Sequence, residues 1–225
     1  MLETSLAGMP VKRIIDENII AYFNSGILLH FDNGQTIING IDEPAGVFLI
    51  KTGFVKAFSI SHDGHVNLLL IHQVGDFIPL PWALDGAHTT GLYYEAIQGV
   101  DVIKASKNKL RTALGNNTWL SQEIMRQTVN IVTVYTQRIQ TLEFRSARGR
   151  MISELLNSSE RFGEKKDQQI LINAPITYQD IADSINMNRE TASRALEDLF
   201  EEGLVNQLNH MFIILDLPRL QQALM

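Results

Sequence analysis

The 225-residue sequence contains no cysteine. Disulfides, thiolate nucleophiles, cysteine-ligated zinc and iron–sulfur clusters are therefore excluded together. The sequence also lacks any apolar run close to the about 18 residues that a membrane-spanning helix needs. Its first residues contain no basic segment followed by an apolar stretch, as a signal peptide would. We therefore expect a cytoplasmic protein with no membrane partner.

Basic residues are also scarce, because 19 Lys and Arg stand against 25 Asp and Glu and give a net charge of −6. A polyanionic partner would have to be bound by a local arrangement of cations. The hydrophobic fraction of 45% and the charged fraction of 20% are typical of a folded globular protein. The length favours more than one domain.

In residues 28–105, short runs rich in β-forming residues alternate with turn signals about ten residues apart. Asn33-Gly34, Asp63-Gly64 and Gly75-Asp76 are such signals. This pattern predicts a small antiparallel β-roll, similar to a cyclic-nucleotide-binding or cupin-like jelly roll. We assign it to a first domain, residues 1–115, and the overall fold to the α+β class.

Residues 116–144 contain neither Gly nor Pro, which predicts one long helix of about 40 Å. Two apolar stripes run along this segment. The first consists of Leu120, Ile124, Ile131 and Val134. The second, spaced close to a 3.5-residue repeat, consists of Met125, Thr128, Val132, Tyr135, Ile139 and Leu142. We expect the first stripe to pack on the chain's own β-roll and the second on the same helix of a second copy, giving a homodimer. The alternative is a central helix buried within one monomer.

Residues 145–225 form the third predicted domain, a winged helix-turn-helix. After a helix and a polar loop over residues 160–169, Thr177 and Asp180 have the spacing of a capping box. Asn186 suits the turn that ends this helix, because Asn tolerates the left-handed conformation. Asn188 is a good N-cap for a second helix, and Gly203 ends it. Two short helices joined by about three residues are the helix-turn-helix pattern.

The second helix presents polar side chains that suit DNA bases. Arg189, Glu190, Ser193 and Arg194 occupy its first two turns and share its outer face. In a major groove an Arg donates two hydrogen bonds to guanine, and a Glu accepts one from cytosine. The candidate phosphate contacts are Thr177, Tyr178, Gln179, Asn188 and His210. The alternative is a solvated helix face with an Arg–Glu pair at its surface.

Residues 204–215 read as a hairpin directly after this helix, which is the position of a wing. Charge is also sorted along the helix. Arg189 and Arg194 lie near its start, whereas Glu197, Asp198 and Glu201 lie toward its end. The net negative charge is therefore compatible with a nucleic-acid contact at the start of the helix.

The chain resembles the Crp/Fnr family of bacterial transcription regulators over nearly its whole length. Residues 46–56 and Gly75-Asp76-Phe77 are similar to the sensor roll of that family, and residues 176–204 to its helix-turn-helix. The most specific match is Arg189-Glu190-Thr191 followed by Ser193-Arg194. The resemblance implies a non-enzymatic homodimeric regulator that binds an inverted-repeat operator and contacts RNA polymerase. It also implies that Glu190 and Arg194 read a G·C pair, with Ser193 and Arg189 adjusting its neighbours.

The roll departs from the members of this family that bind cyclic AMP. They carry Gly-Glu shortly after Gly-Asp-Phe, whereas this chain has Ile78-Pro79-Leu80-Pro81. No Lys or Arg occurs between Lys56 and Lys104, so this part of the roll has no permanent cation for a buried phosphate. We therefore expect no cyclic AMP and no cofactor.

An unidentified small effector stays open, as does a regulator that needs no ligand. The candidate effector pocket consists of Phe77, Pro79, Trp82, His88 and Tyr93. His62 and His65 flank a predicted turn, and we expect no metal there. A cupin-like metal-dependent enzyme is a further alternative, but its His-x-His and Glu pattern is absent. We therefore expect no catalytic residues.

Overall fold

A computed structural model describes residues 19, 23, 26–85 and 89–224. The described residues fall into two compact units, divided between Thr136 and Gln137. This division lies inside the long helix α4 (Thr118–Glu143), which the sequence predicts as a separate segment between two domains. The last two turns of α4 therefore belong to the same unit as the C-terminal helices. No described helix has both the length and the apolar character needed to cross a membrane.

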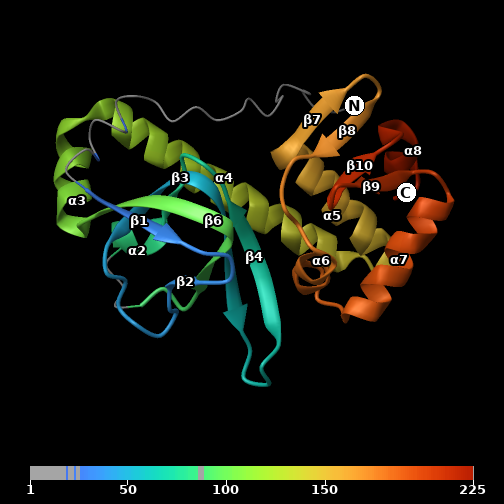
Figure 1. The fold of residues 1–225 in the computed structure, drawn as a ribbon, viewed down its shortest axis with the longest axis horizontal. Helices are drawn as coiled ribbons and strands as arrows, with labels where there is room; N and C mark the ends of the chain where they lie inside the picture. Colours follow the sequence, from blue (N-terminus) through green and yellow to red (C-terminus); the bar gives the residue numbers. More distant parts are fainter. Residues whose placement is uncertain (1–18, 20–22, 24–25, 86–88, 225) are drawn as a thin grey trace. The chain divides into compact units, whose positions relative to one another are not determined.

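The first unit is the predicted antiparallel roll (Figure 1). Its strands are β1 (Ile27–Phe31), β2 (Thr36–Ile38), β3 (Val47–Ile60), β4 (Val66–His72), β5 (Phe77–Ile78) and β6 (Tyr93–Ala105). They pair in the order β1-β6-β3-β4, with β2 on β6 and β5 on β3. Two short helices, α2 (Leu80–Asp85) and α3 (Lys107–Asn116), complete the unit before α4.

Gly53 allows the long strand β3 to bend where its register with β6 shifts. Its φ is +79°, and a Cβ added there would lie 2.5 Å from the carbonyl oxygen of Gly99. A side chain at this position would be strained by the backbone conformation and would also collide with the neighbouring strand.

The first apolar stripe of α4 packs on the roll, as predicted. Leu120 and Ile124 are buried in one core cluster with Phe23, Leu49 and Phe77. Val134 is buried in a second cluster, which is built from β-strand residues, and Ile131 packs against both. Burial of this stripe fixes which face of α4 lies on the sheet.

The second stripe of α4 is largely uncovered in the single chain. The side chains of Met125, Val132 and Ile139 are 68%, 59% and 62% exposed, and Thr128 is exposed as well. Leu142 is half-buried. Tyr135 differs from the expectation, because it is half-buried against the second core cluster of its own roll.

The second unit contains the predicted winged helix-turn-helix (Figure 1). Its helices are α5 (Ala147–Phe162), α6 (Tyr178–Ser184), α7 (Arg189–Glu201) and α8 (Leu217–Gln222). Its strands, β7 (Gly163–Lys166), β8 (Gln169–Ile172), β9 (Val205–Leu208) and β10 (Met211–Ile214), form an antiparallel sheet in the order β7-β8-β10-β9. The predicted polar loop over residues 160–169 is therefore wrong in part. The charged segment of β7 pairs with the apolar strand β8, and a polar edge strand carries little hydrophobic signal.

Candidate DNA-binding interface

Helix α6 begins with the predicted capping box. The hydroxyl of Thr177 accepts a hydrogen bond from the Asp180 amide at 3.1 Å, and the Asp180 carboxylate accepts one from the Thr177 amide at 2.9 Å. The inward side of the helix is buried through Ile181 and Ala182. This reciprocal bonding fixes where α6 starts.

The turn between α6 and α7 depends on two Asn residues. Asn186 has a φ of +53°, and the following amide of Met187 donates to the Ala182 carbonyl at 2.9 Å. Asn188 caps α7, because its side-chain oxygen accepts the Thr191 amide at 2.8 Å. The inner face of α7 is buried through Ala192, Ala195, Leu196 and Leu199. Both predicted roles of these Asn residues are confirmed.

The outer face of α7 brings the four predicted base-reading residues together. Arg189, Glu190 and Arg194 are exposed, and Ser193 is half-buried. Nη2 of Arg194 lies 2.5 Å from Oε1 of Glu190, and the Ser193 hydroxyl donates to Glu197 at 3.1 Å. An exposed ion pair of this kind contributes little to stability. Glu190 and Arg194 can therefore give up their bond to each other and bond base edges instead.

Four of the five predicted phosphate contacts are exposed, and one is half-buried. Thr177, Gln179, Asn188 and His210 are exposed, and Gln179 donates to Asp183 at 2.7 Å. Tyr178 is half-buried, with its hydroxyl 3.3 Å from Oε1 of Gln207 and its ring centroid 5.8 Å from that of Phe212.

Burial raises the pKa of Tyr178, so its hydroxyl stays protonated at neutral pH. The Tyr178 hydroxyl joins the start of α6 to the wing strand β9. This contact depends on Gln207, 29 residues further along the chain, and nothing in the local sequence pattern indicates it.

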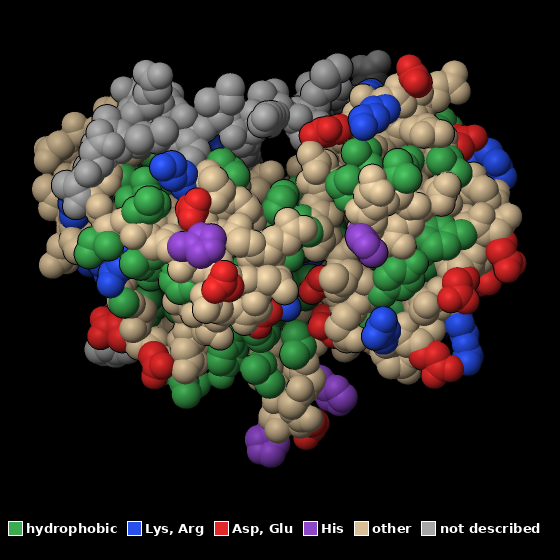
Figure 2. Space-filling view, in the orientation of Figure 1, with side chains coloured by type: hydrophobic (Ala, Val, Ile, Leu, Met, Phe, Trp, Pro, Cys, Tyr) green, Lys and Arg blue, Asp and Glu red, His purple; other side chains and the backbone are tan. Residues whose placement is uncertain are grey.

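The wing is formed by β9 and β10, as predicted. Asn209 and His210 lie at its tip with φ values of +50° and +65°, and both are exposed. The preceding Leu208 is 57% exposed, which places an apolar side chain beside the tip. Figure 2 shows acidic and basic side chains interspersed on the face in view. This face therefore offers individual charged side chains rather than a broad basic surface.

An ion pair between α5 and the end of α7 was not found from the sequence. Both terminal nitrogens of Arg148 bond the two carboxylate oxygens of Glu202, at 2.7 and 2.8 Å. This two-pronged geometry holds the C-terminal end of α7 against α5. The predicted base-reading residues lie at the opposite end of α7. Arg148 and Glu202 are 54 positions apart, so no local motif could reveal the pair.

The structure describes four of the five residues of the predicted effector pocket. Phe77 and Trp82 are buried in the packed core of the roll, and Pro79 is buried as well. Tyr93 stacks on Phe58 with ring centroids 5.6 Å apart. His88 lies outside the described residues. Phe77, Pro79 and Trp82 therefore contribute to core packing, as apolar and aromatic side chains commonly do.

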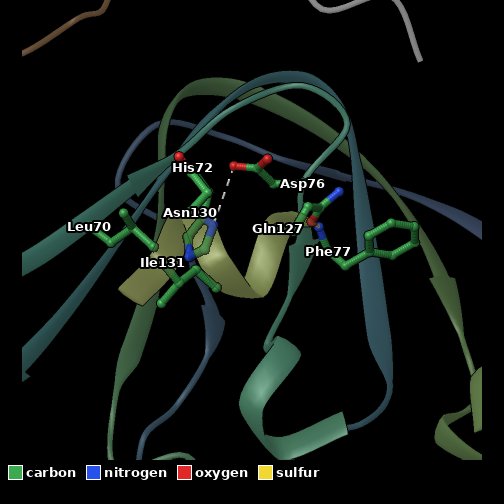
Figure 3. A pocket seen from close by; sticks show the side chains of 7 residues that line it. All are labelled: Leu70, His72, Asp76, Phe77, Gln127, Asn130 and Ile131. Atoms are coloured by element: carbon green, nitrogen blue, oxygen red, sulfur yellow. Dashed lines mark hydrogen bonds and ion pairs between the residues drawn. The ribbon is translucent and has the colours of Figure 1, made fainter. Parts of the chain in front are cut away.

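A different hollow lies between the roll and α4 (Figure 3). Its lining residues are Leu70, His72, Asp76, Phe77, Gln127, Asn130 and Ile131. The cavity volume is about 10 Å³, enough for roughly one water molecule. Of the predicted pocket residues that the structure describes, Phe77 alone contributes to this hollow.

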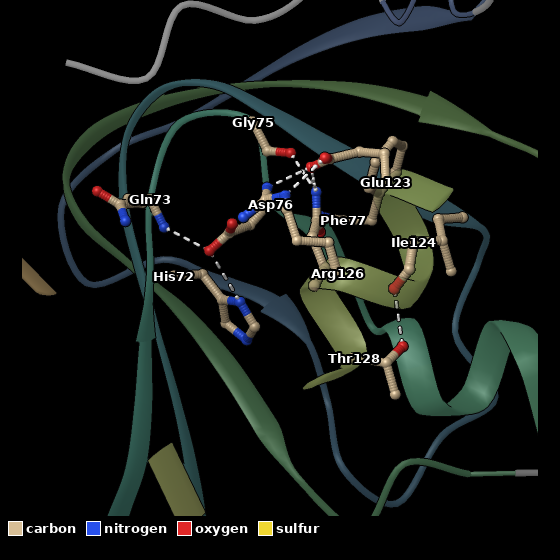
Figure 4. A network of polar contacts seen from close by, with 10 residues as sticks. His72, Gln73, Gly75, Asp76, Phe77, Glu123, Ile124, Arg126 and Thr128 are labelled. Atoms are coloured by element: carbon tan, nitrogen blue, oxygen red, sulfur yellow. Dashed lines mark hydrogen bonds and ion pairs between the residues drawn. The ribbon is translucent and has the colours of Figure 1, made fainter. Parts of the chain in front are cut away.

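Figure 4 shows the turn before β5, with Gly75 and Asp76 labelled, beside α4, and Gln127 of α4 bonds this turn. Its side-chain oxygen accepts the Phe77 amide at 2.9 Å, and its nitrogen donates to the Gly75 carbonyl at 2.8 Å. Beside it, Nδ1 of His72 lies 3.5 Å from the Asp76 carboxylate. Gln127 is 4% exposed, so these bonds are shielded from water.

Comparisons with known proteins agree with this geometry. The Crp-like helix-turn-helix domain matches residues 149–223. A CRP-like cAMP-activated global transcriptional regulator of Mycobacterium tuberculosis is 24% identical over 191 residues, covering 84% of each chain. Electron transport regulator A of Shewanella oneidensis is 26% identical over 185 residues, covering 81% of this chain and 72% of the relative.

Solved structures show the same fold. FixK2 from Bradyrhizobium japonicum superposes with a TM-score of 0.73 at 22% identity, covering 88% of this chain and 96% of the other. A CooA mutant from Carboxydothermus hydrogenoformans superposes with a TM-score of 0.76 at 18% identity, covering 94% and 96%.

The capped α6–turn–α7 unit followed by a wing defines a DNA-binding transcription regulator of the winged helix-turn-helix class. Within that class, residues 149–223 form a Crp-like helix-turn-helix domain, and the chain is similar over most of its length to transcription regulators of the Crp/Fnr type. Its relatives are transcription regulators, so the alternative of a cupin-like enzyme is set aside.

Proposed function

We propose that this regulator acts as a homodimer on an inverted-repeat operator, which it reads with Arg189, Glu190, Ser193 and Arg194. The observation that carries the proposal is the shared outer face of α7, whose start is fixed by the Asn188 cap and whose end is held by Arg148. The start of a helix that is held at both ends can enter a major groove without losing its orientation.

The uncovered stripe of α4 supports the dimer. Met125, Val129, Val132 and Ile139 are each about 60% exposed or more, although all are large and apolar. Their spacing is that of a helix packed along an identical helix, so the occupant we propose is α4 of a second copy. A mass near 25 kDa by light scattering at micromolar concentration would contradict this. Val132→Glu should shift the dimer toward monomer, whereas Gln122→Glu, at an exposed polar position of the same helix, should not.

We further propose that cyclic AMP is not the effector. A buried phosphate without a cation is costly, and residues 57–103 contain no Lys or Arg, so backbone amides alone would have to hold the phosphate of a cyclic nucleotide. The hollow between the roll and α4 holds about one water molecule, and Gln127 already bonds the turn beside it. Titration calorimetry with cyclic AMP and cyclic GMP tests this, and micromolar binding would overturn it.

The decisive experiment is selection of bound duplexes from a random DNA pool, with and without a metabolite extract. We expect an inverted repeat whose half-site centres lie one or more turns apart, at about 10 to 10.5 base pairs per turn. The extract should leave the affinity unchanged if no ligand is needed. Failure to enrich any duplex in modest salt would contradict the operator proposal.

We also propose, from the family resemblance, that the bound dimer contacts RNA polymerase in the cytoplasm. Transcription in vitro from a promoter that carries the selected operator tests this. An operator-dependent change in transcript supports the proposal, whereas identical transcript levels with and without the regulator would contradict it.

A further inference from the structure

Arg138, on the last turns of α4, has its side chain directed into the DNA-binding unit rather than toward solvent. It is 8% exposed, and its Nη1 donates to the backbone carbonyl of Ser184 and to the Ser184 hydroxyl, the latter at 3.1 Å. Ser184 is the last residue of α6. The carbonyls at the end of a helix have no intrahelical partner and carry partial negative charge, so a cation is stabilising there.

A second helix contributes a carboxyl group to the same region. Burial raises the pKa of Glu154 of α5, while its hydrogen bond with Ser184 and the charges of Arg138 and Arg161 oppose that rise. The polar groups of Arg138, Glu154 and Ser184 therefore come from three helices, α4, α5 and α6.

Other polar contacts hold the same end of α4 and α6. The Thr141 hydroxyl of α4 lies 2.7 Å from the Ser153 hydroxyl of α5. Arg150 of α5 donates to the carbonyl of Ile185, which follows α6, at 3.3 Å. The end of α6 opposite its exposed start is thus held by directional bonds, whereas most of the unit's interior is apolar.

A buried guanidinium is a weak source of stability, because its desolvation offsets the hydrogen bonds that it donates. Its directional bonds nevertheless permit few relative orientations of the groups that make them. α6 carries Thr177 and Gln179 at its start and leads through a four-residue turn into α7. A change in the angle of α6 against α4 would therefore move the base-reading side chains.

We propose that Arg138 is a positioning residue, which sets the orientation of the helix-turn-helix against the end of α4 and so determines operator affinity without touching DNA. The proposal rests on the proposed DNA-binding function. Arg138 lies outside the proposed DNA-binding interface, on a helix that carries none of the proposed base-reading residues.

The test replaces the side chains of Arg138 and Glu154 by apolar ones of similar size, in the double variant Arg138→Met/Glu154→Leu of the full chain. Apolar replacement of a buried pair commonly preserves stability, so we expect the melting temperature to stay within a few degrees of wild type. Affinity for the duplex selected by the wild-type protein should nevertheless fall about tenfold, in the range found for positions that couple without ligand contact. Affinity for random duplex should change less.

A matched control removes an ion pair from the roll. Lys56 and Glu95 are 2.7 Å apart and about one quarter exposed, and Lys56→Met/Glu95→Leu should leave operator affinity within about twofold of wild type. Arg138→Lys retains the charge and a donor toward Ser184, so it should retain most of the affinity, within about threefold of wild type. It also keeps the proposal testable if the double variant fails to fold, because Arg138→Lys should then bind more weakly than wild type at an unchanged melting temperature.

Hydrogen exchange of the α6 and α7 amides gives a readout that does not need DNA. We expect faster exchange there in Arg138→Met/Glu154→Leu and unchanged exchange in the roll control. Operator affinity equal to wild type in the double variant would overturn the proposal, whatever the exchange. If the wild-type protein selects no duplex, the DNA-binding proposal fails by itself, and unchanged exchange in α6 would separately overturn the positioning role of Arg138.

Discussion

Glu190 and Arg194 pair across one turn of α7, with Oε1 of Glu190 2.5 Å from Nη2 of Arg194. The acid precedes the base by four residues, which is the favourable order for such a pair on a helix. Both side chains are about three quarters exposed, so water competes for every hydrogen bond they make. The pair orients the Arg194 guanidinium in the unbound protein while leaving it able to bind a base.

Arg194→Ala should therefore weaken binding to the selected operator by about 1 to 3 kcal/mol per half-site and relax specificity at one base pair. Gln179→Ala, at the start of α6, should weaken all sequences alike, because a phosphate contact carries no base information. Electrophoretic mobility shifts on the selected and on random duplexes measure both effects. An equal loss on both duplexes for Arg194→Ala would remove its base-reading role.

Asn186 provides a test of the turn. Its φ of +53° is strained for residues with a Cβ, and Asn tolerates it better than Ala does. Asn186→Ala should lower the free energy of unfolding by about 1 kcal/mol, whereas Asn186→Gly should leave it within about 0.5 kcal/mol. Urea denaturation followed by circular dichroism distinguishes the two variants. Equal stability of the Ala and Gly variants would show that this conformation does not govern the turn.

Gln127→Leu should destabilise the roll, because it leaves the buried amide of Phe77 and the carbonyl of Gly75 without their bonds. Each unsatisfied buried group costs about 1 to 3 kcal/mol. Trp82 and Trp119 both belong to the roll unit, so urea denaturation followed by tryptophan fluorescence reports on it. Gln122→Leu, at an exposed position of α4, is the control. A loss in Gln127→Leu no larger than in the control would contradict the bonding assigned to Gln127.

His30 should titrate above its ordinary pKa. The hydrogen bond that Nδ1 of His30 donates to the Asp101 carboxylate, at 2.7 Å, raises the pKa of His30, and the same bond lowers the pKa of Asp101. The His30 contribution to stability is present below its unfolded pKa of about 6.5 and is lost as pH rises through the folded value. The Asp101 contribution is present above its unfolded pKa of about 3.9 and is lost as pH falls through the folded value. The pair is therefore most stabilising between about pH 4 and 6.5.

Proton NMR titration of the His30 ring tests this pair. In Asp101→Asn the pKa of His30 should move down toward 6.5, whereas Asp63→Asn, at the distant hairpin turn, should not change it. An unchanged His30 titration in Asp101→Asn would show that this bond is not maintained in solution.

The helix-turn-helix could be predicted because each signal acts within a few residues. The Thr177–Asp180 capping box, the left-handed Asn186 and the Asn188 cap each use a bond or a backbone conformation within one turn of chain. Such local preferences act before distant segments meet. Helix periodicity by itself predicted that Arg194 lies on the outer face of α7.

The candidate effector pocket could not be predicted in the same way. Trp82 and Phe77 resemble pocket residues in composition, but the structure packs them into the core. The hollow between the roll and α4 depends on His72 and Gln127, which are more than 50 residues apart in the chain. Aromatic or polar character does not indicate which distant side chains will meet.

The sequence by itself therefore determined the roll, the long helix, and the start and outer face of the recognition helix, because periodicity, caps and turn residues act locally. The tertiary structure alone decided that Tyr178 joins the wing, that Tyr135 packs on its own roll and that Arg138 caps α6. Each of these contacts brings together residues far apart in the chain. Their formation depends on the packing of the whole unit, which no short stretch of sequence records.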